Sequence, residues 1–90
     1  MIIRIVCEGQ YRLPGTAAKR LTELDAHVLD ALERGDEQRF HAAFTELLTF
    51  IERTGSRLSD YELAVSNLVV PHRDTTLAEA QDAFAGEIVG

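Results

Sequence analysis

Two histidines and an aspartate are the residues that could bind a metal ion. His27, Asp30 and His41 fall in two segments whose hydrophobic spacing, described below, predicts neighbouring helices. Imidazole and carboxylate groups are common metal ligands, and the two histidines could approach each other across such a helix pair. Neither histidine has the His-x-x-x-His or Cys-x-x-Cys spacing that places ligands on one face. We therefore predict no metal site and expect two histidines at the boundary between core and solvent.

The single cysteine, Cys7, is the candidate nucleophile. Glu8 follows it directly, and a neighbouring carboxylate disfavours the negatively charged thiolate that reacts. We expect Cys7 to be a small, buried hydrophobic residue. The sequence has no glycine-rich phosphate loop and no serine nucleophile elbow. It predicts a protein that is not an enzyme and uses no cofactor. The alternative is a small metal or thiol enzyme that uses His27, His41 or Cys7.

Binding is better supported than catalysis by the segment Glu8-Gly9-Gln10-Tyr11-Arg12. It joins a turn to an amphipathic aromatic residue and a cation, and Tyr and Arg are the residue types that anchor protein interfaces. The alternative is a plain hairpin in which Tyr11 packs on the helices. A basic cluster is also expected where the first strands meet the first helix, and it could face an acidic partner or an anionic membrane surface. Its members are Arg4, Arg12, Lys19 and Arg20.

The elements that position these residues begin with a β-hairpin. Residues 2–7 are mostly β-branched and predict a strand, with Ile3, Ile5 and Cys7 on one face. Glu8-Gly9 offers a turn, and residues 10–13 predict a second strand, which Pro14-Gly15 ends.

A helical hairpin follows, bounded by four capping residues. Thr16 is a suitable N-cap for the first helix and Gly35 a suitable end, while Asp36 can cap the second helix and Gly55 end it. The short connection makes the two helices antiparallel neighbours. Each has an apolar stripe at helical spacing: Leu21, Leu24, Val28, Ala31 and Leu32 in the first, and Phe40, Ala43, Phe44, Leu47, Leu48 and Ile51 in the second.

The remaining segment contains two capping-box patterns, at Ser59–Glu62 and Thr76–Glu79. The first predicts a short helical turn and the second a short final helix that ends near Gly86. That helix would face inward with Leu77, Ala80, Ala83 and Phe84. A possible third strand lies near residues 67–70, with Leu68-Val69-Val70 at its centre. The fold class is therefore α+β: a small N-terminal β-hairpin packed against an antiparallel helical hairpin, plus a short C-terminal helix.

Composition limits the classes of function. Ninety residues with 46% hydrophobic content fit one domain, residues 1–90. The net charge of −6 argues against a nucleic-acid partner, which requires a surplus of Lys and Arg. No run of apolar residues is long enough to cross a bilayer, and one cysteine allows no internal disulfide, so we expect a cytoplasmic protein. Unpaired strand edges make a homodimer an expected state.

Charge is distributed unevenly along the chain. Residues 1–20 carry four basic and one acidic side chain, whereas residues 59–90 carry one basic and six acidic side chains. The positive N-terminal end contains the segment from Glu8 to Arg12. We therefore expect this end to bind a partner.

Four segments resemble one known family, that of the PspA-associated domain (PspAA). They are Ile-Ile-Arg-Ile-Val-Cys-Glu-Gly-Gln-Tyr-Arg-Leu at 2–13, Ala-Leu-Glu-Arg-Gly-Asp at 31–36, Asp-Tyr-Glu-Leu followed by Ser-Asn-Leu-Val-Val-Pro within 60–71, and Asp-Thr-Thr-Leu-Ala-Glu-Ala at 74–80. The resemblance covers nearly the whole chain. The segment Glu-Gly-Gln-Tyr-Arg is its most distinctive part.

The resemblance implies a small cytoplasmic accessory of the phage-shock system. PspA is a coiled-coil, ESCRT-III-like protein that acts on the inner membrane during envelope stress. The chain would bind PspA or modulate its assembly, and would reach the membrane only through that partner. The resemblance supplies no catalytic motif, and Cys7 falls at a variable position of the pattern. By inference, Glu8, Gly9, Gln10, Tyr11 and Arg12 form the contact surface. Direct binding to an anionic membrane is the alternative.

Overall fold

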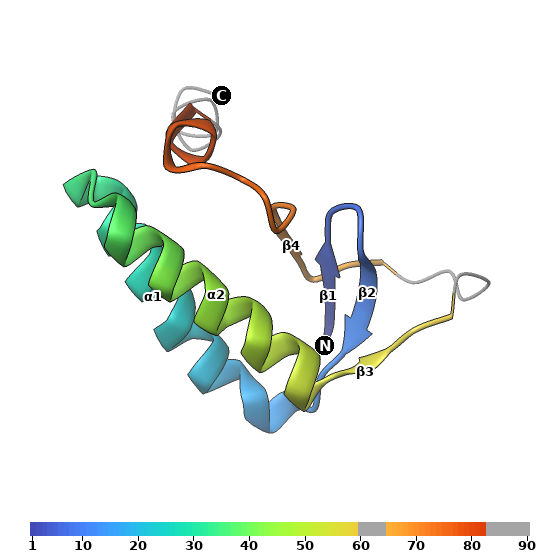
Figure 1. The fold of residues 1–90 in the computed structure, drawn as a ribbon. Helices are drawn as coiled ribbons and strands as arrows, with labels where there is room; N and C mark the ends of the chain where they lie inside the picture. Colours follow the sequence, from blue (N-terminus) through green and yellow to red (C-terminus); the bar gives the residue numbers. More distant parts are fainter. Residues whose placement is uncertain (60–64, 83–90) are drawn as a thin grey trace.

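The computed structural model describes residues 1–59 and 65–82, and it confirms an α+β fold (Figure 1). A four-stranded sheet lies beside a pair of long helices. The elements in chain order are β1 (Ile2–Ile5), β2 (Gly9–Arg12), the 3-10 helix η1 (Gly15–Ala17), α1 (Ala18–Arg34), α2 (Glu37–Thr54), β3 (Ser56–Arg57) and β4 (Leu68–Val70). A further short helix covers residues 77–82.

The sheet has the strand order β3-β2-β1-β4. β1 pairs antiparallel with β2, placing Ile3 opposite Tyr11 and Arg4 opposite Gln10. On its other side β1 pairs parallel with β4, and β2 pairs antiparallel with β3. The predicted third strand is thus confirmed as β4. The two-residue strand β3 was not predicted from the sequence. It follows α2 directly, and its pairing with β2 depends on where the C-terminal end of α2 lies relative to the sheet.

The first strand is shorter than predicted, and this changes the environment of Cys7. β1 ends at Ile5, and residues 6–8 form the turn before β2. Cys7 adopts a left-handed backbone with φ of 70° and is exposed. The prediction of a buried Cys7 is therefore wrong. The alternation of a strand stops before this residue, so its side chain does not follow those of Ile3 and Ile5 into the core.

The helix boundaries are confirmed at three of the four predicted positions. Gly35 ends α1 with φ of 65°, a left-handed conformation that glycine adopts without steric cost. Asp36 caps α2, since its carboxylate accepts a hydrogen bond of 3.1 Å from the Arg39 amide. Gly55 follows the end of α2. The N-cap prediction for Thr16 is wrong: this residue lies inside η1, and α1 begins after Ala17 without a side-chain cap.

The core lies between one face of the sheet and the helix pair. Ile3 and Ile5 of β1 are completely buried. The predicted stripes of both helices point into the same cluster, with Ala43 only partly buried. Among the described residues, helices cover only this face of the sheet, so these residues form two layers. The buried stripe residues are Leu21, Leu24, Val28, Ala31, Leu32, Phe40, Phe44, Leu47, Leu48 and Ile51.

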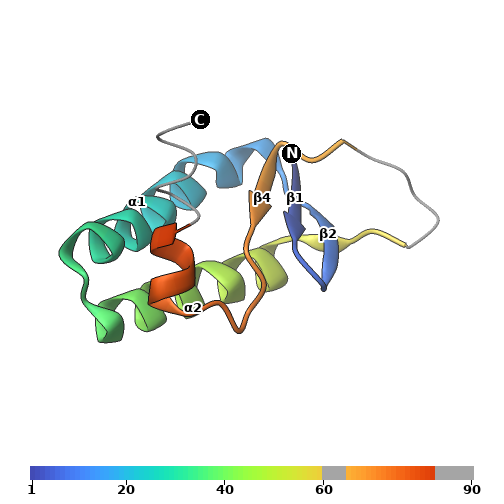
Figure 2. The ribbon, with the colours of Figure 1, turned by 90° about the horizontal axis from the view of Figure 1, so that it is seen from above.

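The segment after β4 returns to the helices. Helix 77–82 lies over α1 and α2 (Figure 2), and its Ala80 is buried in the common core. The predicted capping box is confirmed at its start. The Glu79 amide donates to Thr76 Oγ1, and the Thr76 amide donates to a Glu79 carboxylate oxygen, each at 3.2 Å. Leu77 is partly buried, as predicted.

Several predictions for the tail lie outside the described residues. They are the helical turn after Ser59 at residues 60–62, the inward-facing Ala83 and Phe84, and the helix end at Gly86. Within the described ranges, no helix is both long and apolar enough to cross a bilayer.

The Asp36 cap provides a test of the helical hairpin. Replacing Asp36 by Ala should lower the free energy of unfolding by about 1 kcal/mol, because one amide of the first turn of α2 loses its acceptor. Asp36→Asn should stay close to the wild type, since Asn caps equally well and the exposed ion pair with Arg39 contributes little. Urea denaturation of the three proteins measures both effects. Equal stability of the Ala variant would contradict the capping role.

Candidate functional site

The predicted contact segment, Glu8 to Arg12, is divided between the two faces of the sheet. Its residues leave the turn after β1 and continue through β2. Side chains alternate across a strand, so Gln10 and Arg12 share one face while Tyr11 takes the other. The segment therefore does not present one continuous surface.

The face turned away from the helices carries two cations. The strand registers place six residues there, and we call this set the outer face: Ile2, Arg4, Gln10, Arg12, Ser56 and Val69. Arg4 and Arg12 are exposed, and Val69 exposes 57% of its surface. The Gln10 side chain donates a 2.8 Å hydrogen bond to Ser66 Oγ. The outer face thus combines guanidinium groups with apolar side chains, as many protein interfaces do.

Tyr11 lies on the inner face of the sheet. It stands opposite Ile3, which is fully buried, and its half-buried side chain packs against the core. Of the two sequence-based alternatives for Tyr11, the structure supports packing on the core.

Glu8 has a structural role at the turn. Its carboxylate forms a 2.9 Å ion pair with Arg73, which also pairs with Glu52 at the end of α2. Arg57 of β3 donates a 2.8 Å hydrogen bond to the backbone carbonyl of Glu8. The hydrogen bonds that Arg73 donates, first to Glu8 and then to Glu52, raise the pKa of Arg73. These contacts tie the β1–β2 turn to α2 and to the segment after β4.

The predicted basic cluster is divided as well. Arg4 and Arg12 lie on the outer face, whereas Lys19 and Arg20 are exposed on α1. Arg20 forms ion pairs with Glu23 at 3.2 Å and with Glu46 at 3.1 Å, so carboxylates on both helices balance its charge. Two of the four cations, Arg4 and Arg12, therefore lie together on the outer face.

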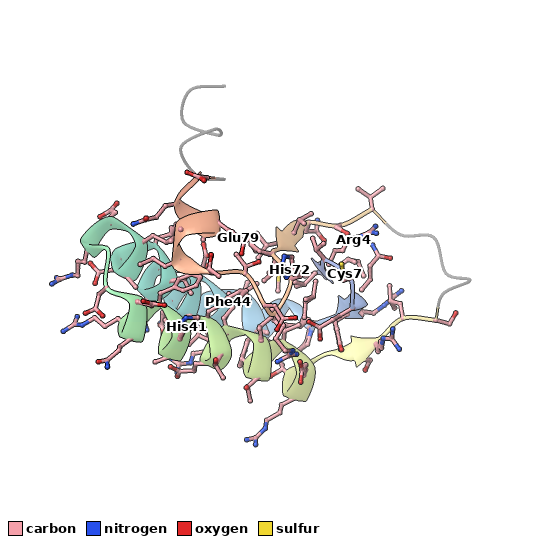
Figure 3. The ribbon with its side chains drawn as sticks, turned by 45° about the horizontal axis from the view of Figure 1, so that its top comes forward. Arg4, Cys7, His41, Phe44, His72 and Glu79 are labelled. Carbon is pink, nitrogen blue, oxygen red and sulfur yellow. The ribbon has the colours of Figure 1, made fainter. Side chains whose placement is uncertain are left out.

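The histidines are not gathered into one site. His27 lines a shallow hollow with Asp30 and Glu46, while His41 lies 3.7 Å from Glu37 on its own helix and contacts the ring of Phe40. Figure 3 shows His41 among the helices, away from Cys7 and His72 at the sheet. In the described part of the chain, no group of three His, Cys, Asp or Glu residues is placed to hold a metal ion.

Cys7 lies in a different hollow from His27. The walls of this hollow include Glu8, His72 and Arg73. His72 therefore lines the same hollow as the Cys7 thiol, whereas His27 lines another. No local pattern indicates this proximity, because residues 7 and 72 are brought together by the parallel pairing of β1 with β4.

Asp25 is a candidate binding residue that the sequence analysis missed. It lies on α1 and lines a largely apolar cavity together with residues of α2 and β4. Burial raises the pKa of the Asp25 carboxyl above its ordinary value of 3.8. The only sequence signal was its position beside Leu24, at the edge of the apolar stripe.

Comparison with known proteins gives a single finding. The model of the family described as PspA-associated protein (PspAA) matches residues 1–90, which is the whole chain. Neither the curated proteins nor the solved structures contain a match.

The raised pKa of Asp25 predicts a pH-dependent stability difference. Above this pKa the folded state holds a partly desolvated charge, and that cost disappears below pH 3.8, where the carboxyl is neutral in both folded and unfolded chains. Asp25→Asn should therefore melt at a higher temperature than the wild type at neutral pH. The difference should shrink as the pH falls through the raised pKa. Thermal unfolding between neutral and acidic pH measures it, with the exposed Glu33→Gln as control. A less stable Asn variant at neutral pH would contradict the assignment.

Proposed function

The chain belongs to the PspA-associated protein family, and from that premise we propose that it is a non-catalytic accessory that binds PspA. The whole-chain family match is the observation that carries this proposal. By the resemblance stated above, PspA is a coiled-coil, ESCRT-III-like protein of the envelope-stress response. The accessory would modulate PspA assembly in the cytoplasm and reach the inner face of the membrane only through PspA.

The contact surface that we propose is the outward part of the segment from Glu8 to Arg12, extended to Arg4. Gln10 and Arg12 belong to the outer face with Arg4, and Gly9 allows the chain to enter β2 with a φ of 114°. Glu8 and Tyr11 support this surface from behind, since Glu8 pairs with Arg73 and Tyr11 packs on the core. Two cations beside Ile2 and Val69 favour a partner that presents carboxylates next to apolar side chains.

A non-catalytic role is supported by the arrangement of the reactive residues. His27 lines a hollow with Asp30 and Glu46, whereas His41 lies beside Glu37 on its own helix. The Arg73 guanidinium near Cys7 forms ion pairs with Glu8 and Glu52. In our proposal the ion pairs of Arg73 stabilise the fold and do not activate Cys7 as a nucleophile. We include a homodimer in the proposal, because β3 and β4 are the edge strands of the sheet and could pair with another copy.

Charge reversal on the outer face tests the binding proposal. Arg4→Glu combined with Arg12→Glu should weaken binding to PspA by at least about tenfold, because repulsion replaces attraction at both positions. Isothermal titration calorimetry with folded, purified proteins measures the affinity. The control is Arg34→Glu combined with Arg53→Glu, which reverses two charges on the helices.

Three results would contradict the proposal. If the wild type did not bind PspA, PspA would be excluded as the partner. If the control pair weakened binding as much as the Arg4 and Arg12 substitutions do, the outer face would be excluded as the specific binding surface. Salt-sensitive sedimentation of the chain alone with anionic vesicles would favour direct membrane binding instead.

A further inference from the structure

A cavity of about 170 Å³ lies between the helix pair and β4. Val28 and Phe44 form part of its floor on α1 and α2, Val70 and Pro71 form one wall, and Ala80 of helix 77–82 forms another. Figure 2 shows the elements that contribute these residues, with helix 77–82 over α1 and α2 and with β4 beside β1. A dry apolar cavity of about 150 Å³ is large enough to bind benzene. The space therefore suits one apolar side chain.

One charged residue interrupts the apolar lining. Asp25 is half-buried on α1, and among the described residues that line the cavity it is the only ionisable one. Within the described residues, no hydrogen bond or ion pair engages its carboxylate. A partly desolvated carboxylate without a partner gains most from a cation that enters beside it.

We propose that this cavity binds a protein segment that inserts one apolar side chain and places a lysine or arginine next to Asp25. The apolar walls favour the first group and the Asp25 carboxylate favours the second. An amphipathic helix provides such a pair on neighbouring turns, as in other helix-in-groove complexes. An acidic segment is disfavoured, since it would meet both Asp25 and a net charge of −6. The inference does not require that PspA supply the segment, so it stands apart from the proposed function.

A small amphiphilic cation tests the site without knowledge of the partner. n-Hexylammonium carries an apolar tail and a cationic head, and its affinity should be on the order of millimolar for so few atoms. Titration into the ¹⁵N-labelled full chain should give saturable shifts at Val28, Phe44, Val70 and Ala80. Sodium hexanoate, which reverses the charge of the head, should bind about tenfold more weakly.

Replacing the Asp25 carboxylate by an uncharged amide measures how much its negative charge contributes to binding. Asp25→Asn should bind n-hexylammonium about tenfold more weakly than the wild type, with n-hexanol affinity unchanged. Glu33→Gln, which removes an exposed carboxylate of α1, should bind as the wild type does. The absence of shifts at the cavity, or equal affinity for hexanoate and hexylammonium, would overturn the site.

Two other occupants give different results. If a second copy of the chain fills the cavity, sedimentation equilibrium should show a dimer that Asp25→Asn dissociates, and the proposal of a different protein would be overturned. If a free polyamine is the ligand, spermidine should bind more tightly than n-hexylammonium, which would also overturn it. We expect spermidine to bind no more tightly, because it has charge at both ends and no apolar tail.

Discussion

The fold depends on the burial of one face of β1 against the helix pair. Ile3 and Ile5 are completely buried, and β1 is the strand that pairs with both β2 and β4. Burial of a side chain of this size contributes about 1.5–3 kcal/mol, a large part of the stability of a small domain. The apolar residues of α1 and α2 supply the opposing surface. Without this contact, the strands would lack an apolar layer to cover their inner face.

In the described part of the chain, the other face of the sheet carries exposed side chains that a partner could contact. The alternation that directs Ile3 and Ile5 inward directs Arg4 outward, and pairing with β2 places Gln10 and Arg12 beside it. Ion pairs from Arg73 to Glu8 and Glu52 hold the turn at the end of this surface. The cavity at Asp25 arises from the same architecture, where β4 and helix 77–82 approach the helix pair without filling the space between them.

The local elements could be predicted because their signals lie close together in the sequence. The spacing of Val28, Ala31, Phe40 and Phe44, with Gly35 and Asp36 between them, was sufficient to define the helical hairpin. The capping box at Thr76 and Glu79 likewise identified the start of helix 77–82.

The long-range arrangement could not be predicted in the same way. The parallel direction of β4, the addition of β3 and the meeting of Glu8 with Arg73 depend on how distant segments pack. The prediction that Cys7 is buried was wrong, because residues 6–8 form a turn where the sequence predicted a continuing strand. The proposed contact segment could be selected from the sequence, but the division of its side chains between two faces required the strand register. Asp25 was missed because an acidic residue beside an apolar stripe is ordinarily solvated.

The central claim is that the outer face of the sheet contacts PspA while the inner face forms the core. Cross-saturation NMR measures it most directly, with the labelled chain observed in the presence of unlabelled PspA. The account predicts saturation transfer to Arg4, Gln10, Arg12 and Val69, with little transfer to the exposed surfaces of α1 and α2. Transfer confined to the helices would contradict the account, as would a complex in which no residue of the outer face is affected.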